Sequence, residues 1–177
     1  MKTAKGISLI EMIVTISVLA VVTAVAVPVY TTQVANAKAE KLAMDIQQLV
    51  DFAGAYADRR WKPAYIHLIN IPNDATTEDT TWCLVASPYS TVTKCSDDED
   101  TAAEIANEKR IATVFGNKHP DIALKRLTTQ TKFMFDNNSY SMFLGGDRKE
   151  NHISFLEAQV GNKTFTAKVN YRYFELE

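Results

Sequence analysis

The chain of 177 residues lacks the features that mark most enzymes and nucleic-acid-binding proteins. Its 19 Lys and Arg residues are slightly outnumbered by 21 Asp and Glu residues, so no basic excess indicates a nucleic-acid partner. The only three His residues (His67, His119 and His152) lie far apart, and no Gly-rich phosphate loop or nucleophile motif occurs. We therefore expect no enzymatic activity, no catalytic residues and no cofactor, and nucleic acid is not an expected partner.

A long apolar run at the amino end is the main feature that the sequence does have. In residues 7–30 the only charged residue is Glu11, and about twenty apolar residues suffice to cross a bilayer as a helix. The preceding leader carries Lys2 and Lys5, and no charged residue follows the run until Lys38. The positive-inside bias therefore predicts a cytoplasmic amino end and an exported remainder.

Glu11 needs a partner, because an ionised carboxylate inside hydrocarbon costs several kcal/mol when it is unpaired. The apolar run is too long for an ordinary secretory signal, whose apolar region has about 7–15 residues, and a small residue, Gly6, directly precedes it. Cleavage after Gly6 would free the amine of Ile7. This amine could pair with Glu11 of a neighbouring copy, or with Glu11 of its own helix one turn away. The alternative is a plain signal anchor with Glu11 near the lipid headgroups.

Residues 5–11 (Lys-Gly-Ile-Ser-Leu-Ile-Glu) resemble the class III signal of type IV prepilins and type II secretion pseudopilins. In that family a membrane prepilin peptidase cleaves after the Gly and methylates the new amine, so the resemblance implies processing at Gly6 and Ile7. It places Glu11 fifth in the mature chain, where the family has its Glu. Pro28 becomes the twenty-second mature residue, where many members have a helix-bending Pro. Ile7 departs from the family pattern, in which Phe or Met is more usual.

The helical pattern continues beyond the apolar run but becomes amphipathic. Apolar residues recur at spacings of three and four, which is typical of a helix that packs one face on a domain. These residues are Leu42, Ile46, Leu49, Val50, Ala53 and Tyr56. We therefore divide the chain into a leader (1–6), a transmembrane and assembly helix (7–30), its amphipathic continuation (31–60) and an exported globular domain (61–177).

In the exported domain, a period of two predicts four strands at residues 132–136, 140–144, 153–160 and 164–174. Asn137-Asn138 and Gly161-Asn162 provide hairpin turns between them. We also expect an extended segment at 65–71, a helix at 101–115 and a helical turn at 122–127. A long helix packed on a four-stranded antiparallel meander is an α+β arrangement, and it is the pilin fold that the resemblance implies.

Cys83 and Cys95 are the only cysteines, and both lie in the part that we expect to be exported. Two Cys residues without a nearby His pair make a weak metal site, so we expect no metal there. An even pair outside the cytoplasm is more typical of a disulfide. We predict a Cys83–Cys95 bond that stabilises the fold by about 3 kcal/mol.

Residues 97–100 form a run of four acids directly before the helix expected at 101–115. Acids at a helix amino end interact favourably with the helix dipole, which is sufficient reason for the run. Clustered carboxylates also suit Ca²⁺, but four consecutive acids do not all point one way, and the interrupted spacing of a calcium loop is missing. We therefore predict no metal site.

The sequence thus predicts a structural filament subunit, and more specifically a minor or priming pilin. The resemblance implies these partners: other pilin subunits, the prepilin peptidase, an inner-membrane assembly platform, and membrane lipid before assembly. It places the chain in the bacterial inner membrane with an exported carboxyl-terminal domain, and later in a filament. The alternatives are a pseudopilin of a type II secretion system, or a binding module (adhesin or DNA-uptake receptor) that the filament displays.

Overall fold

The computed structural model describes residues 8–73, 80–92, 94–95, 111–136, 141–144, 147–149, 153–169 and 174–176. For residues 141–143, 147–149 and 174–176 it describes the backbone alone. The chain divides into two compact units, Met1–Ala37 and Lys38–Glu177.

Helix α1 (Leu9–Arg60) confirms the long amino-terminal helix predicted from the apolar run and its amphipathic continuation. It continues through Pro28 without interruption. At its carboxyl end Trp61 takes a left-handed conformation (φ 53°) and donates its N–H to the carbonyl of Ala57 at 3.1 Å. This closing bond and the following Pro63 end the helix.

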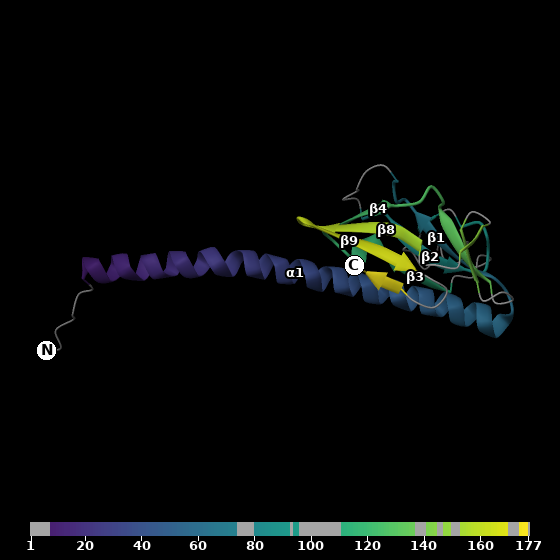
Figure 1. Cartoon of the computed structure of the whole chain (residues 1–177), viewed down its shortest axis with the longest axis horizontal. Coiled ribbons are helices and arrows are strands. Elements are labelled where there is room, and N and C mark those ends of the chain that lie inside the picture. Colours follow the sequence, from purple (N-terminus) through teal and green to yellow (C-terminus); the bar gives the residue numbers. More distant parts are fainter. Residues whose placement is uncertain are drawn as a thin grey trace. The chain divides into compact units, whose positions relative to one another are not determined.

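In the second unit, the predicted apolar face of α1 is buried. Leu42, Ile46 and Leu49 are each 1% exposed. Burial of one such side chain stabilises a fold by about 1.5–3 kcal/mol, so this face is a principal part of the core of the unit. Figure 1 shows the carboxyl-terminal half of α1 running along the strands of this unit.

The strands of the second unit form two antiparallel sheets, the first with six strands in the order β3-β2-β1-β5-β6-β7. Their bounds are β1 (Ala64–Ile69), β2 (Cys83–Ser87), β3 (Ala112–Phe115), β5 (Lys132–Asp136), β6 (Ser141–Leu144) and β7 (Asp147–Lys149). Strand β1 lies at the centre, with His67 opposite Val85 of β2 on one side and opposite Lys132 of β5 on the other.

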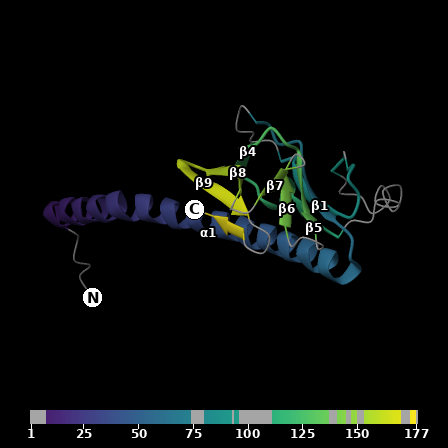
Figure 2. The same ribbon diagram turned by 45° about the vertical axis from the view of Figure 1, so that its right-hand side comes forward.

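The second sheet has four strands in the order β10-β9-β8-β4. Its strands are β4 (Ile122–Arg126), β8 (Ile153–Val160), β9 (Lys163–Val169) and β10 (Phe174–Leu176). Figure 2 shows strands β1, β5, β6 and β7 in one group and β4, β8 and β9 in another. Between β8 and β9, Gly161 has φ 59°, a conformation that glycine adopts without strain, which confirms the predicted turn.

A cluster of aromatic rings links the two sheets inside the second unit. Phe133 and Phe135 of β5 meet edge to face at 5.7 Å, and Phe133 meets Phe155 of β8 at 5.2 Å. All three side chains are at most 2% exposed. Edge-to-face pairs of this kind add about 0.5–1.5 kcal/mol beyond the burial of their area.

The α+β fold with a helix on a four-stranded antiparallel sheet is confirmed, but the strands of that sheet differ from those predicted. The predicted strands at 132–136 and 140–144 belong to the six-stranded sheet, and β4 joins β8 in the four-stranded one. The extended segment predicted at 65–71 is strand β1. Asn137 and Asn138 lie outside the described residues.

Two helix predictions were wrong where they can be compared with the structure. Residues 122–127 were expected as a helical turn, but Ile122–Arg126 is strand β4, paired along its length with β8. The predicted helix at 101–115 ends in strand β3 (Ala112–Phe115), while residues 101–110 lie outside the described residues. In both cases pairing with a strand distant in sequence overrides the local helical spacing.

Candidate functional site

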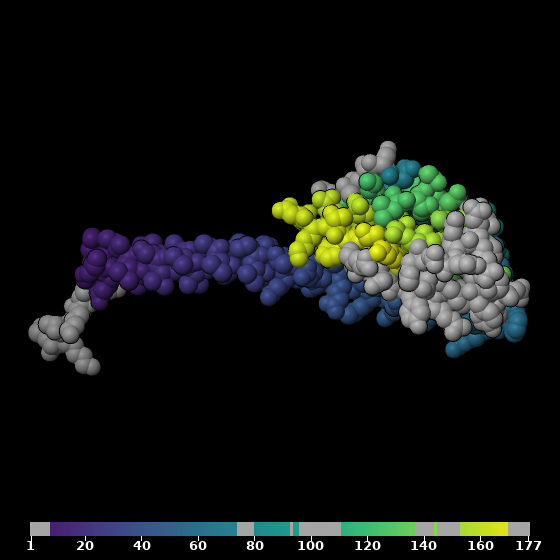
Figure 3. Space-filling model, in the orientation of Figure 1, coloured from purple at the N-terminus to yellow at the C-terminus, as the bar shows by residue number. Residues whose placement is uncertain are grey.

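The first part of α1 presents its apolar side chains to the surroundings. Every large hydrophobic residue between Leu9 and Tyr30 is between 51% and 78% exposed. Within the described residues, α1 is the one helix long and apolar enough to cross a membrane, judged by length and composition. Figure 3 shows this part of the chain as a rod one helix wide. Such a surface requires a lipid or protein environment, because an apolar patch of this extent is unusual on a monomer in water.

Glu11 forms part of the helix cap at the start of this rod. The N–H of Ser8, directly before the first helical residue, donates to Oε2 of Glu11 at 2.9 Å. This is half of a capping box, in which a Glu at the third helical position reaches back to the N-cap residue. The Ser-x-x-Glu spacing from Ser8 to Glu11 is a known signal for such a box and could have predicted this contact. Glu11 therefore has a local role in helix initiation.

Polar side chains farther along the rod are bonded within the helix. Thr15 donates its hydroxyl to the carbonyl of Glu11 at 2.9 Å, and Ser17 donates to the carbonyl of Ile13 at 2.8 Å. Thr23 donates to the carbonyl of Leu19 at 2.9 Å. Satisfied hydroxyls are tolerated in hydrocarbon, so these residues do not conflict with a membrane span.

The remaining predicted site residues of this unit are placed only in part. Pro28 lies inside α1, and its carbonyl accepts a hydrogen bond from the hydroxyl of Thr31 at 3.0 Å. Gly6 and Ile7, the predicted cleavage and methylation positions, lie outside the described residues.

The second unit contains the predicted disulfide between Cys83 and Cys95, with Cα atoms 5.8 Å apart. Cys83 lies in β2, while Cys95 lies in the segment after that strand. The bond packs in a small apolar cluster with Ile69, Val85 and Val92. It therefore holds the segment after β2 against the core.

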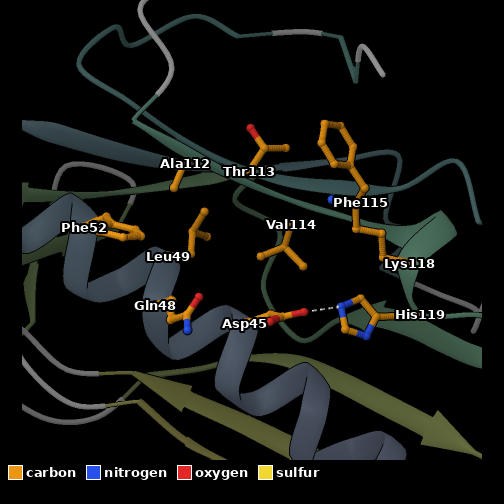
Figure 4. Close-up of a pocket in the computed structure, with 10 residues that line it drawn as sticks. All are labelled: Asp45, Gln48, Leu49, Phe52, Ala112, Thr113, Val114, Phe115, Lys118 and His119. Atoms are coloured by element: carbon orange, nitrogen blue, oxygen red, sulfur yellow. Dashed lines mark ion pairs between the residues drawn. The ribbon is translucent and has the colours of Figure 1, made fainter. Parts of the chain in front are cut away.

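A pocket of about 230 Å³ opens in the second unit between α1 and strand β3. Ten side chains line it, namely Asp45, Gln48, Leu49, Phe52, Ala112, Thr113, Val114, Phe115, Lys118 and His119. Figure 4 shows Ala112 and Val114 pointing toward the helix, while Thr113 and Phe115 point the other way. Five of the ten lining residues are polar or charged (Asp45, Gln48, Thr113, Lys118 and His119), so the pocket has a mixed lining. No local sequence pattern indicates this pocket, because its residues lie far apart along the chain.

His119 forms the polar end of this pocket with Asp45 of α1. Nε2 of His119 lies 2.9 Å from Oδ2 of Asp45, at ion-pair distance but not at the angle of a good hydrogen bond. The His119 side chain is 1% exposed, and its ring stacks on Trp82 with centroids 6.1 Å apart. Burial lowers the pKa of His119 below 6.5, and it outweighs the attraction of Asp45, which acts in the opposite direction.

The other two His residues are not brought to this pocket. His67 is buried, and its Nε2 lies 2.9 Å from the carbonyl oxygen of Tyr89. His152 and the acidic run at 97–100 lie outside the described residues. Among the residues that the structure does describe, no group of three His, Cys, Asp or Glu side chains could hold a metal ion.

The amino end of the chain also matches a known family model. Residues 1–27 match the prokaryotic N-terminal methylation motif. This motif is the class III prepilin signal, which confirms the resemblance and is consistent with the type IV pilin and pseudopilin family. Neither the curated proteins nor the solved structures include one that matches the chain. Because the matched residues end within the first half of α1, the function of the second unit has to be inferred from its own geometry.

Proposed function

We propose that this chain is a structural subunit of a type IV pilus or a related filament, stored in the membrane and polymerised through α1. The observation that carries the proposal is the methylation motif at residues 1–27, together with the exposure of every large apolar residue between Leu9 and Tyr30 in the first part of α1. A helix that only packed on its own domain would have one buried face. A helix whose apolar side chains are exposed can exchange lipid for neighbouring helices.

Glu11 supports this function because it combines a local and an intermolecular role. Before cleavage its carboxylate accepts the N–H of Ser8. A carboxylate has two oxygens and accepts several hydrogen bonds, so Glu11 can also receive the charged amine of Ile7 from a neighbouring subunit. In this proposal the apolar helix supplies the contact area between subunits, and Glu11 supplies one polar contact.

Within this function we propose a minor or priming subunit, whose exported domain lies outside the inner membrane. Support comes from the irregular second unit, which has two sheets and the α1–β3 pocket. The alternatives are a displayed adhesin or DNA-uptake receptor, which the filament test below distinguishes, and a pseudopilin of a type II secretion system.

The test is mass spectrometry of the chain from cells with and without an active prepilin peptidase. We expect a mature chain that begins at methylated Ile7 in the first cells and an uncleaved chain in the second. A chain of unchanged length with an unmethylated Met1 in both would contradict the proposal.

The amount of chain in sheared filaments distinguishes the finer alternatives. A scarce chain whose deletion removes the fibres is a priming subunit, whereas a chain that dominates the fibre is a major pilin. Normal fibres that lose adhesion or DNA uptake after the deletion would indicate a displayed binding module. A chain absent from every filament would refute assembly itself.

A further inference from the structure

A short segment between β3 and β4 lies against α1 and buries little of its own surface. It comprises the 3₁₀ helix η2 (Gly116–Lys118) and residues 119–121, and we call it the η2 turn. Gly116 and His119 are its two buried residues, and the other four are exposed. A segment with so few buried groups can open locally at a low cost in free energy, without unfolding of the strands on either side.

Polar contacts at the surface join the η2 turn to one side of α1. Nζ of Lys38 lies 2.7 Å from Oδ2 of Asp121. Nζ of Lys41 donates to the carbonyl of Lys118 at 3.3 Å. Lys38, Lys41 and Asp45 follow one another at spacings of three and four residues, so they lie on the same side of the helix. The turn is thus held along about two turns of α1.

The backbone of the η2 turn is strained where it contacts Lys38. Asp121 follows Pro120 and has φ 65°, in the left-handed region. A Pro followed by a left-handed residue is typical of a type II turn, in which Gly or Asn is the usual second residue. Asp is less favourable at that position than Gly, but it supplies the carboxylate that contacts Lys38. Strain in the backbone therefore favours opening, and the ion pair opposes it.

The buried side chain of the turn, His119, is titratable. Its ring is 1% exposed and stacks on Trp82, so a proton on the ring would be held away from water. Asp45 attracts such a charge, whereas Lys41 and Lys118 repel it. Burial outweighs the attraction and lowers the pKa of His119. The closed turn therefore disfavours the protonated ring, which an open turn would expose to water.

We propose that the η2 turn is a pH-sensitive switch, which lies against α1 at neutral pH and opens in acid when a proton from solvent binds the released ring of His119. Opening separates this ring from Trp82 and Asp45. Because Asp45 and His119 line the α1–β3 pocket, the shape and charge of the pocket then depend on pH. This inference does not depend on the function proposed above.

Two backbone contacts limit the opening to the turn itself. At its start Gly116 donates its N–H to the carbonyl of Trp82 at 2.9 Å, and directly after its end Ile122 pairs with Val160 of β8. The apolar face of α1 remains buried against the strands when only the segment between these contacts moves.

The test measures amide hydrogen exchange by NMR in the full chain in detergent. The N–H of His119 donates to the carbonyl of Gly116 at 2.9 Å, so its exchange reports on opening of the turn. Its protection factor should fall about tenfold between pH 7.5 and pH 5.5. A single proton that binds only the open state, with the ordinary His pKa of about 6.5, changes the opening equilibrium by this factor.

Local opening is distinguished from global unfolding by a reference amide, that of Ala158 in β8, a strand paired on both sides. The N–H of His119 should exchange faster than that of Ala158. Low concentrations of urea should accelerate exchange at Ala158 but not at His119, because local opening exposes little surface.

Two variants separate the titrating group from the surface contact. His119→Gln does not titrate, so protection at position 119 should be equal at the two pH values. Asp121→Asn keeps a residue that tolerates the left-handed conformation and removes the charge beside Lys38. It should increase opening by about 1.5-fold to fivefold at both pH values and leave the tenfold ratio unchanged. Protection of Ala158 serves as the check of folding.

Equal protection of the His119 N–H at pH 7.5 and pH 5.5 in the unaltered chain would overturn the inference. A tenfold change that persists in His119→Gln would also overturn it, because another group would then cause the opening. Exchange at His119 with the same rate and urea dependence as at Ala158 would show global unfolding instead of a switch. The first and third outcomes are read from the unaltered chain, so they do not require either variant to fold.

Discussion

His119 and Asp45 join two elements that are distant in sequence, with Nε2 and Oδ2 2.9 Å apart. Asp45 belongs to α1, and His119 directly follows the short 3₁₀ helix η2 (Gly116–Lys118). A second contact between the same elements runs from Nζ of Lys41 to the carbonyl of Lys118 at 3.3 Å. The carboxyl-terminal half of α1 is thus held to the sheet beside the pocket by polar contacts as well as by its apolar face.

The first prediction concerns the pH dependence of stability. Burial lowers the pKa of His119 in the folded chain, so below pH 6.5 the unfolded chain binds a proton that the folded chain does not. The contribution of His119 to the free energy of unfolding should therefore be fully present above pH 6.5. It should decrease as the pH falls below 6.5, by at most about 1.4 kcal/mol per pH unit for one proton. Urea unfolding of the full chain in detergent at pH 7.5 and 5.5 measures this.

His119→Gln is the control for this prediction, because Gln keeps a polar group but does not titrate. The difference in the free energy of unfolding between pH 7.5 and pH 5.5 should therefore be smaller in the variant, by the part that protonation of His119 causes. If the variant retains the whole difference in the free energy of unfolding, other titrating groups cause that difference.

The second prediction compares two glycines. A Cβ at Gly116 would lie 2.5 Å from the carbonyl oxygen of Thr80 and 2.8 Å from Cε2 of Trp82, so Gly116→Ala should destabilise the fold by about 1–3 kcal/mol. A Cβ at Gly54 in α1 would meet nothing within 4 Å. Gly54→Ala should therefore stabilise by about 0.5–1 kcal/mol, because Ala favours helix more than Gly does.

Urea midpoints of the two variants and the unaltered chain, measured side by side, test this comparison. Equal midpoints for Gly116→Ala and Gly54→Ala would contradict the close packing of Gly116 against Trp82.

The third prediction concerns the disulfide. Cys83 and Cys95 are twelve residues apart, and the loss of a bond that closes a loop of this length costs about 3 kcal/mol in the chain-entropy model. The double variant Cys83→Ser, Cys95→Ser should therefore unfold at lower denaturant, and reductant should not change its midpoint further. A large effect of reductant on the double variant would show that the loss has another origin.

The fourth prediction separates the two roles of Glu11. Glu11→Ala removes both the acceptor for the Ser8 N–H and the charge, while Glu11→Gln keeps an acceptor oxygen and removes the charge. Both variants should be processed and inserted. If charge pairing with Ile7 drives assembly, both should reach sheared filaments in amounts about tenfold lower than the unaltered chain.

Immunoblots of sheared filaments and of membranes measure the two fractions. Normal incorporation of Glu11→Gln would refute the charge-pairing account and indicate that the cap is sufficient. Normal incorporation of Glu11→Ala would show that assembly needs neither role of Glu11.

Features encoded by local patterns were predictable from the sequence. The apolar run with one Glu predicts the first part of α1, and the spacing of Leu42, Ile46 and Leu49 predicts its buried face. The disulfide follows from two cysteines in a part of the chain expected outside the cytoplasm. Each of these predictions depends on residues close together in sequence or on composition alone.

Features that depend on distant pairing were not predictable in the same way. Ile122, Ala123 and Leu124 are all buried, so β4 shows no alternation that would distinguish a strand from a helical turn. The division into two sheets depends on pairs such as Ala64 with Phe135, which no local pattern encodes. For the same reason the α1–β3 pocket, which combines residues of α1, β3 and η2, could not be foreseen.

The internally bonded hydroxyls of Thr15, Ser17 and Thr23 bear on how specific the contacts between copies of this helix would be. Since their donors are already used, these side chains offer no free hydroxyl proton to a neighbouring copy. In a filament assembled as proposed above, the contacts along this part of α1 would be apolar, and Glu11 would be the charged group that distinguishes one axial register from another.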